Sequence, residues 1–372
     1  MFADPALGES ESRAVFVDPS TGNVTGDLTV YGTSGALPLR TWLSNLHRSL
    51  LLGEPGRVYS ELAASWLWVL ALSGAGLWLA RWQRTKPERR RRTLVLPEAG
   101  ELNAYRRTLN RHSAAGIWLA LSFLFLSATG LTWSARAGAN VAELRTVLGW
   151  TTPTLDTALQ SGDGTGAAGG HEGHSGHAGH TMATPTAGAE YDGVLAVARD
   201  AGIDSSLVEI APPAADGQAW SVTEVDRSWP TQADSVAVDP TTDRVVNEVR
   251  FQDYGLAAKL TRWGIDAHMG LLFGLVNQVV LFVVALGLAA MTVWGYLMWW
   301  RRRPGFGAGR APVRGALRRT PWWVVVGLAV TTVAVGMFLP LLGISLLCFL
   351  GVDVVVGVIL RMARRRGTRQ LA

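Results

Sequence analysis

Seven histidines are the residues of this sequence best suited to bind a metal ion or to carry a proton near neutral pH. Three of them, His47, His112 and His268, stand beside long apolar runs. A single histidine at such a boundary is usually an amphipathic interface residue that hydrogen-bonds the backbone. Their spacing therefore has to decide whether they act together.

His47 and His268 occupy equivalent positions in an internal repeat with an offset of 221 residues. The segments VFVDPSTGNV (15–24) and VAVDPTTDRV (236–245) each place two β-type runs around an Asp-Pro-x-Thr turn, which predicts a hairpin. The same offset relates a tryptophan and a glycine on either side of each histidine, giving the pairs Trp42/Trp263 and Gly53/Gly274. We therefore expect two duplicated units, each a hairpin, a histidine segment and a membrane span.

Two histidines in duplicated units can meet across a pseudo-symmetry axis. A pair of neutral imidazoles facing each other inside a membrane protein suits a low-spin b-type haem that is held without covalent attachment. We therefore expect His47 and His268 to bind one haem, with Gly53, Gly270 and Gly274 allowing close approach of the macrocycle or close helix packing. Gly116 follows His112 and would allow the same close approach or packing there.

His112 has no repeat partner in this sequence. By analogy with the second unit, its partner would lie on an apolar span preceding the first hairpin, at the cytoplasmic end. We expect one haem for the sequence as it stands, and two in a longer form that carries such a span and an α+β module at its N-terminus.

The other four histidines lie in the segment HEGHSGHAGH, at positions His171, His174, His177 and His180. The surrounding stretch, residues 161–187, is rich in Gly, Ala and Thr, which is typical of a flexible linker. A mobile histidine tract can still bind Cu(II), Zn(II) or Ni(II) weakly. Metal capture and a solvated linker both remain open for this segment.

Five apolar runs are long enough to cross a bilayer as helices, at residues 62–79, 114–133, 271–300, 322–339 and 341–360. Charged residues make up 17% of the chain and apolar residues 48%, which agrees with membrane insertion. The predicted fold is therefore a mainly α membrane protein with about five transmembrane helices. Pro340 separates the last two as a helical hairpin.

Arginine clusters give the expected orientation. They occur at 81–92, at 301–319 and after residue 361, so all three fall on one side if the spans alternate. That side is the cytoplasm by the positive-inside rule, which places the N-terminus outside and the C-terminus in the cytoplasm. The lipid bilayer is thus the first expected partner, and the net charge of +5 does not indicate nucleic acid.

A small α+β module is expected outside the membrane, because residues 191–201 have helical spacing and 207–210 and 220–225 are strand-like. We divide the chain into an extracytoplasmic segment (1–57), a span (58–82), a basic loop (83–111), a span (112–134), a linker (135–187), the module (188–252), a pre-helix with a span (253–300), a loop (301–320), a two-span hairpin (321–361) and a tail (362–372).

Several kinds of chemistry are absent from the sequence. The single cysteine, Cys348, excludes an intrachain disulfide, a thiolate-ligated iron–sulfur cluster and covalent CxxCH haem attachment. No P-loop, dinucleotide fingerprint or hydrolase triad is present, so electrons would have to come from the quinone pool or a membrane dehydrogenase. Asp353 inside the last span is an ionisable functional candidate, whereas Asn277 and Gln278 more often form interhelical hydrogen bonds.

Residues 15–304 resemble the PepSY-associated transmembrane family, most clearly in the segments 46–82 (LHRSLLLGEPGR…), 110–134 (NRHSAAGIWLAL…) and 266–304 (DAHMGLLFGLVNQ…). The resemblance implies PepSY-like extracytoplasmic modules, membrane-embedded haems and reduction of iron-siderophore complexes. Family members usually open with a helix bearing an LHR-type motif, which this sequence lacks, and the histidine tract is not a general family feature.

Two functions are consistent with these observations. The first is a haem b-bearing transmembrane protein that transfers electrons to extracytoplasmic ferric complexes, such as iron-siderophores, in iron uptake. The second is a non-enzymatic PepSY membrane module that binds a peptide, a metal or a protein partner. The sequence assigns no catalytic residue beyond the histidines that would hold the haem.

Overall fold

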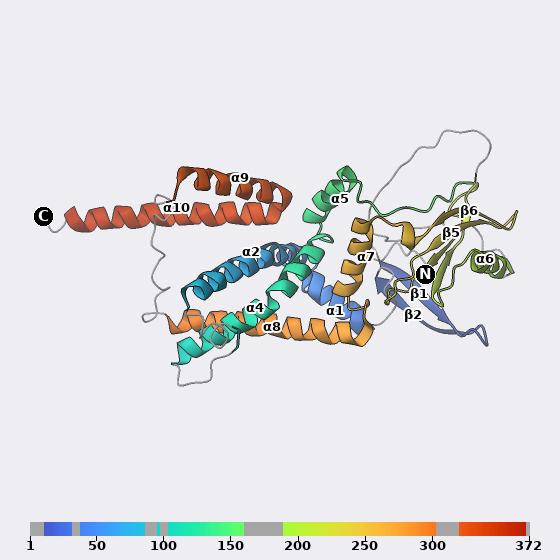
Figure 1. The fold of residues 1–372 in the computed structure, drawn as a ribbon, viewed down its shortest axis with the longest axis horizontal. Helices are drawn as coiled ribbons and strands as arrows, with labels where there is room; N and C mark the ends of the chain where they lie inside the picture. Colours follow the sequence, from blue (N-terminus) through green and yellow to red (C-terminus); the bar gives the residue numbers. More distant parts are fainter. Residues whose placement is uncertain are drawn as a thin grey trace. The chain divides into compact units, whose positions relative to one another are not determined.

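The computed structural model describes residues 11–31, 38–85, 95–96, 103–159, 189–302 and 320–369 (Figure 1). The chain divides into two compact units. Unit 1 comprises residues 1–51 and 144–279, and unit 2 comprises residues 52–143 and 280–372. Each unit has its own cluster of buried apolar side chains.

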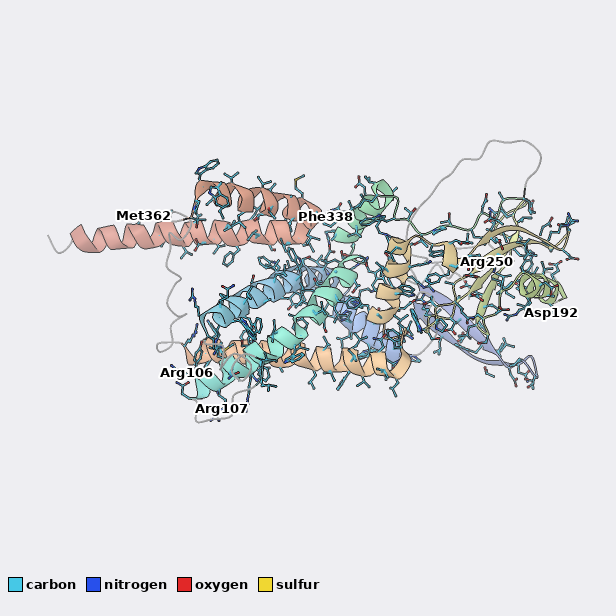
Figure 2. All side chains as sticks on the ribbon, viewed as in Figure 1. Arg106, Arg107, Asp192, Arg250, Phe338 and Met362 are labelled. Atoms are coloured by element: carbon cyan, nitrogen blue, oxygen red, sulfur yellow. The ribbon has the colours of Figure 1, made fainter. Side chains whose placement is uncertain are left out.

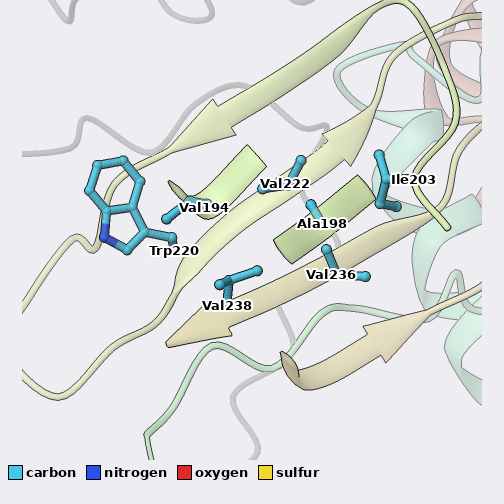
Figure 3. Close-up of a cluster of buried hydrophobic side chains, with 7 residues drawn as sticks. All are labelled: Val194, Ala198, Ile203, Trp220, Val222, Val236 and Val238. Atoms are coloured by element: carbon cyan, nitrogen blue, oxygen red, sulfur yellow. The ribbon is translucent and has the colours of Figure 1, made fainter. Parts of the chain in front are cut away.

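The larger sheet of unit 1 is antiparallel, in the order β3-β4-β5-β6. Its strands are β3 (Val208–Ala211), β4 (Trp220–Glu224), β5 (Ser235–Asp239) and β6 (Arg244–Val249), and helix α6 (Ala189–Asp200) packs on one face. Alternate residues of β4 are buried, as expected for a strand with one face on a core. Figure 3 shows the core residues Val194, Ala198, Ile203, Trp220, Val222, Val236 and Val238. The expected helix and strands of this module are confirmed.

Buried and half-buried charges tie the loops of this sheet together. The carboxylate of Glu224, only 4% exposed, accepts hydrogen bonds from the backbone N–H groups of Asp204 and Ser205, both at 2.9 Å. Arg250, labelled in Figure 2, forms ion pairs with Asp234 at 3.3 Å and Glu248 at 2.7 Å. These bonds satisfy polar groups that burial would otherwise leave without partners.

The smaller sheet of unit 1 is the hairpin of β1 (Glu11–Val17) and β2 (Val24–Tyr31). It reproduces the β5–β6 hairpin in detail. Each turn is closed by an aspartate, Asp18 or Asp239, that accepts the backbone N–H two residues later at 2.9 Å. The ladders of both hairpins are irregular at the equivalent step, Phe16/Val17 and Ala237/Val238. The repeat predicted from sequence is therefore present in the backbone.

Each hairpin leads to a short helix and then to a long apolar one. The short helices are α1 (Pro38–Ser49) and α7 (Leu256–His268), the latter preceded by a 3-10 turn, η1 (Phe251–Asp253). The long helices are α2 (Glu54–Arg84) and α8 (Gly274–Arg301). The third span was expected to begin at residue 271. It begins at Gly274, because α7 ends at His268 and the chain turns through Gly270 at a φ of 74°.

Among the residues that the structure describes, four helices are long and apolar enough to cross a membrane: α2, α4 (Ala104–Leu131), α8 and the Pro340–Ile359 part of α10 (Pro340–Arg369). Arg106 and Arg107 lie in the first turn of α4 (Figure 2). The side chains of these helices are largely exposed, for example Leu77 and Leu121, which fits a lipid environment. The protein is therefore a multi-pass membrane protein.

The fourth of the five expected spans ends one residue earlier than predicted. It forms α9 (Trp322–Phe338), whose 17 residues extend about 26 Å at 1.5 Å per residue, slightly less than a typical hydrocarbon core. Leu339 leaves the helical conformation with φ −115° and ψ 82°, because Pro340 follows it and opens α10. Gly336 and Gly343 face each other across this hairpin at backbone contact.

Unit 2 is held together by polar contacts between its helices. The hydroxyl of Ser127 on α4 donates to the carbonyl of Ala64 on α2 at 2.7 Å, and the indole N–H of Trp66 donates to the hydroxyl of Ser345 on α10 at 2.9 Å. Helix α5 (Ala137–Val147) follows α4 and begins in this unit. Polar groups inside a bilayer stabilise helix association when they find such partners.

Candidate functional site

Helices α1 and α7 bring two of the predicted site histidines together within unit 1. His47 lies in the last turn of α1, and His268 is the last residue of α7. Their ring centroids are 6.2 Å apart and their planes are inclined at 60°. The repeat thus produces a spatial pair from two residues far apart in the sequence.

The separation of the two rings fits a shared metal centre. A ring nitrogen bound to a metal lies about 2 Å from it, and the ring centre lies about 1 Å further, so two axial imidazoles have centroids about 6 Å apart. Rotation of either ring about its own metal–nitrogen axis leaves this distance unchanged, so the 60° inclination is compatible with the arrangement. The ligand role of both residues remains a prediction.

The protonation state of the pair also suits metal binding. Burial is the main cause that lowers the pKa of His268 to about 4, and the nearby His47 lowers it further. His268 is therefore neutral at pH 7 with a lone pair on one ring nitrogen, which is the form that binds metals.

Side chains from the first turns of α8 hold the end of α7 that carries His268. The amide of Asn277 donates to the carbonyl of Ala267 at 2.9 Å, and the amide of Gln278 donates to the carbonyl of Gly270 at 3.3 Å. The first bond joins α8 to the C-terminal turn of α7, and the second holds the turn between the two helices. The interhelical role that we expected is confirmed for Asn277, whereas Gln278 bonds to Gly270 in the turn between α7 and α8.

A buried acidic residue near the pair was not singled out from the sequence. Asp266, two residues before His268, is fully buried and accepts from the Nε–H of Arg262 at 3.1 Å, while Arg227 lies 3.7 Å from its other oxygen. Burial raises the pKa of Asp266, and the two arginines oppose that shift. The i, i+4 spacing of Arg262 and Asp266 on a helix was the available sequence signal.

The third predicted histidine belongs to unit 2. His112 lies on α4, and its imidazole is hydrogen-bonded to the backbone of Met291 on α8. Its Nδ1 atom is buried and has no hydrogen-bond partner among the residues that the structure describes. Gly116, one turn later, faces the side chain of Met291, so α4 and α8 pack closely at this level.

The histidine tract, His171 to His180, lies outside the described residues. Within the described ranges, no group of three or more His, Cys, Asp or Glu side chains is placed to hold a metal ion. The binding of Cu, Zn or Ni by the tract therefore stays a sequence-based prediction. Asp353 is exposed on α10 and has an interaction partner.

A second buried acid was also missed from sequence. Glu61 on α2 is 5% exposed and accepts from the backbone N–H groups of Ala137 at 3.0 Å and Arg136 at 3.4 Å. The guanidinium of Arg136 lies 3.8 Å away. Glu61 thus caps the start of α5, which is a structural role for a charged residue at a span boundary.

The chain was compared with known proteins. A family model described as PepSY-associated TM region matches residues 3–302. No curated protein matches the chain. The matched region is well over half of the sequence. It includes both hairpins, the pair His47/His268 and the helices α2, α4 and α8. The chain therefore belongs to the PepSY-associated transmembrane family.

Proposed function

We propose that this protein is a haem b-bearing transmembrane electron-transfer protein that reduces extracytoplasmic ferric complexes, such as iron-siderophores. The observation that carries the proposal is the pair His47 and His268, with ring centroids 6.2 Å apart at the ends of two repeat-related helices. Family membership supports it, because membrane-embedded haems are expected in this family.

In this proposal each residue has a definite task. His47 and His268 would hold the haem, and the neutral state of His268 at pH 7 keeps its lone pair available. Asn277 fixes the end of α7 and so the position of His268. The haem, when bound, supplies one-electron transfer, and the protein sets its position and potential.

His112 is proposed as a ligand of a second haem in a form of the protein that supplies its partner histidine. Its buried Nδ1 without a hydrogen-bond partner in the described part of the chain supports a further polar contact there. The arginine clusters support an orientation with the N-terminus outside and the C-terminus in the cytoplasm of a bacterial inner membrane. The electron donor would be the quinone pool or a membrane dehydrogenase.

The first test is an absorbance spectrum of the detergent-purified protein, expressed with adequate haem supply. A Soret band with sharp α and β bands on reduction, and a low-spin electron paramagnetic resonance signal when oxidised, are expected for two imidazole ligands. His47→Ala and His268→Ala should each abolish this signature. His112→Ala is the matched control and should retain it.

A colourless protein after haem supplementation would refute the haem proposal and favour a PepSY membrane module that binds a peptide, a metal or a protein. Retention of the bis-imidazole spectrum in His47→Ala would refute the ligand pair while leaving haem binding intact. Once the pair is established, reduction of a ferric chelate added outside oriented vesicles tests the proposed direction of electron transfer.

A further inference from the structure

The loop between β4 and β5 in unit 1 presents a tryptophan at its tip, residues 228–230, which are all exposed. Trp229 in this tip is 55% exposed. The loop is nevertheless well structured, because the carboxylate of Asp226 accepts hydrogen bonds from the backbone N–H and the hydroxyl of Ser228, at 2.9 and 2.7 Å. The indole is thus held outward in a defined turn, away from the core of the sheet.

The tip is attached to the segment where the chain enters α8. The backbone N–H of Trp229 donates to the carbonyl of Leu272 at 2.8 Å, and its ring centroid lies 6.2 Å from that of Phe273. On α7, the ring of Trp263 lies 5.5 Å from the same indole, and its own N–H donates to the hydroxyl of Thr231 at 3.2 Å. The loop is therefore fixed at the level where α8 begins.

The length of α8 relates that level to the bilayer. Its 28 residues extend about 42 Å at 1.5 Å per residue, whereas a bilayer measures about 30 Å across its hydrocarbon core and about 40–45 Å with its headgroups. The two ends of the helix therefore lie in the headgroup layers. Leu275 and Val276 in its first turn are 74% and 70% exposed, so the lipid-facing surface of α8 continues up to Phe273, which is 57% exposed.

We propose that Trp229 and Phe273 insert into this headgroup layer and anchor the β3–β6 sheet to the bilayer surface. Lipid is the partner that fits, because the exposed aromatic surface is continuous with the lipid-facing side of a membrane-spanning helix. An indole combines an apolar ring with a polar N–H, which makes tryptophan favourable at a membrane–water interface. The anchor does not depend on haem binding.

The test measures the depth of a nitroxide spin label on the tip, in full-length protein reconstituted into phosphatidylcholine vesicles. Cys348→Ser removes the single native cysteine, and Ser228→Cys places the label beside an unchanged Trp229. This label should collide more often with oxygen, which concentrates in lipid, than with chromium oxalate, which stays in water. Asp216→Cys is the matched control, because Asp216 is exposed in the loop at the other end of β4, and its label should show the opposite preference.

A preference for chromium oxalate at position 228 would overturn the anchor. Exclusion of both reagents would also overturn it, since the tip would then pack against protein. Trp229→Gln in the Ser228→Cys background should raise collisions with chromium oxalate several-fold, whereas Val246→Gln, which removes an exposed apolar side chain of β6, should not. Unchanged collisions in Trp229→Gln would refute the role of the ring. If Trp229→Gln fails to fold, the label at position 228 beside the native tryptophan still decides the proposal.

Discussion

Gly53 and Gly274 both have a positive φ at equivalent positions of the two repeat units. Their φ angles are 63° and 53°, and each stands where the chain enters a long apolar helix, α2 or α8. Positive φ is readily accessible to glycine and strained for other residues. The histidine pair depends on this turn, because it separates the short helix that carries each histidine from the span that follows.

Replacing either glycine with alanine should therefore strain the backbone without a steric clash, since nothing lies within 4 Å of a Cβ added at either position. We expect Gly53→Ala and Gly274→Ala each to destabilise the protein by about 1 kcal/mol, measured as thermal unfolding in detergent. Gly76→Ala is the control, because Gly76 lies inside α2 with open space and no positive φ, so alanine there should be neutral or stabilising. Equal effects at all three positions would contradict a special backbone role.

The repeat explains why so much of unit 1 could be predicted from sequence. A constant offset fixes the hairpin turns at Asp18 and Asp239 and the histidines of α1 and α7 together, because duplicated units fold alike. The membrane class followed from the length of the apolar runs. The hairpin of α9 and α10 followed from the apolar runs and from Pro340, and α9 ends one residue before the predicted position.

The burial of two acidic residues, Glu61 and Asp266, could not be predicted from the sequence. Glu61 and Asp266 lie next to apolar runs in the sequence. An acidic residue in such a place is normally predicted to be exposed to solvent at the end of a membrane span. Their burial results from tertiary contacts, with the start of α5 for Glu61 and with Arg227 for Asp266, and these contacts join residues far apart in the chain. For the histidine tract, His171 to His180, metal binding remains a prediction from the spacing of its histidines in the sequence.

Glu61 should stabilise unit 2 through the backbone donors that it satisfies. Glu61→Ala leaves the buried N–H of Ala137 and the part-buried N–H of Arg136 without their acceptor, so we expect a loss of about 1–3 kcal/mol in the free energy of unfolding, seen as a lower melting temperature. Glu61→Gln keeps one oxygen acceptor and should lose less. The matched control is Glu54→Ala on the same helix, whose side chain is 68% exposed, and it should change stability by less than about 0.5 kcal/mol.

The hairpin of α9 and α10 depends on glycine at position 343. A Cβ added there would lie 2.6 Å from the carbonyl oxygen of Gly336, so even Gly343→Ala must push the two helices apart. We expect a lower melting temperature and weaker disulfide cross-linking between cysteines introduced on the two helices. Gly351→Ala, further along α10 in open space, should leave both measurements unchanged. Normal cross-linking in Gly343→Ala would mean that the close approach is not required.

The orientation predicted from the arginine clusters can be tested by labelling with a membrane-impermeant maleimide. In a Cys348→Ser background, Ser175→Cys in the histidine segment should be labelled in cells with a permeabilised outer layer, because that segment is expected outside. Arg90→Cys, in the basic loop, should be labelled only after the cytoplasmic membrane is disrupted. Labelling of position 90 in cells with an intact cytoplasmic membrane would reverse the topology.

The histidine pair should also make stability depend on pH. Burial and His47 lower the pKa of His268 to about 4 in the folded protein, whereas an unfolded chain has a histidine pKa of about 6.5. Between these values the unfolded state binds more protons, so the contribution of His268 is complete above pH 6.5 and is lost as the pH falls towards 4. The melting temperature of haem-free protein should therefore fall more between pH 7 and pH 4.5 in wild type than in His268→Gln. Other titrating groups, including the histidine tract, are the same in both proteins and cancel. Parallel curves would show that burial does not hold His268 in its neutral form.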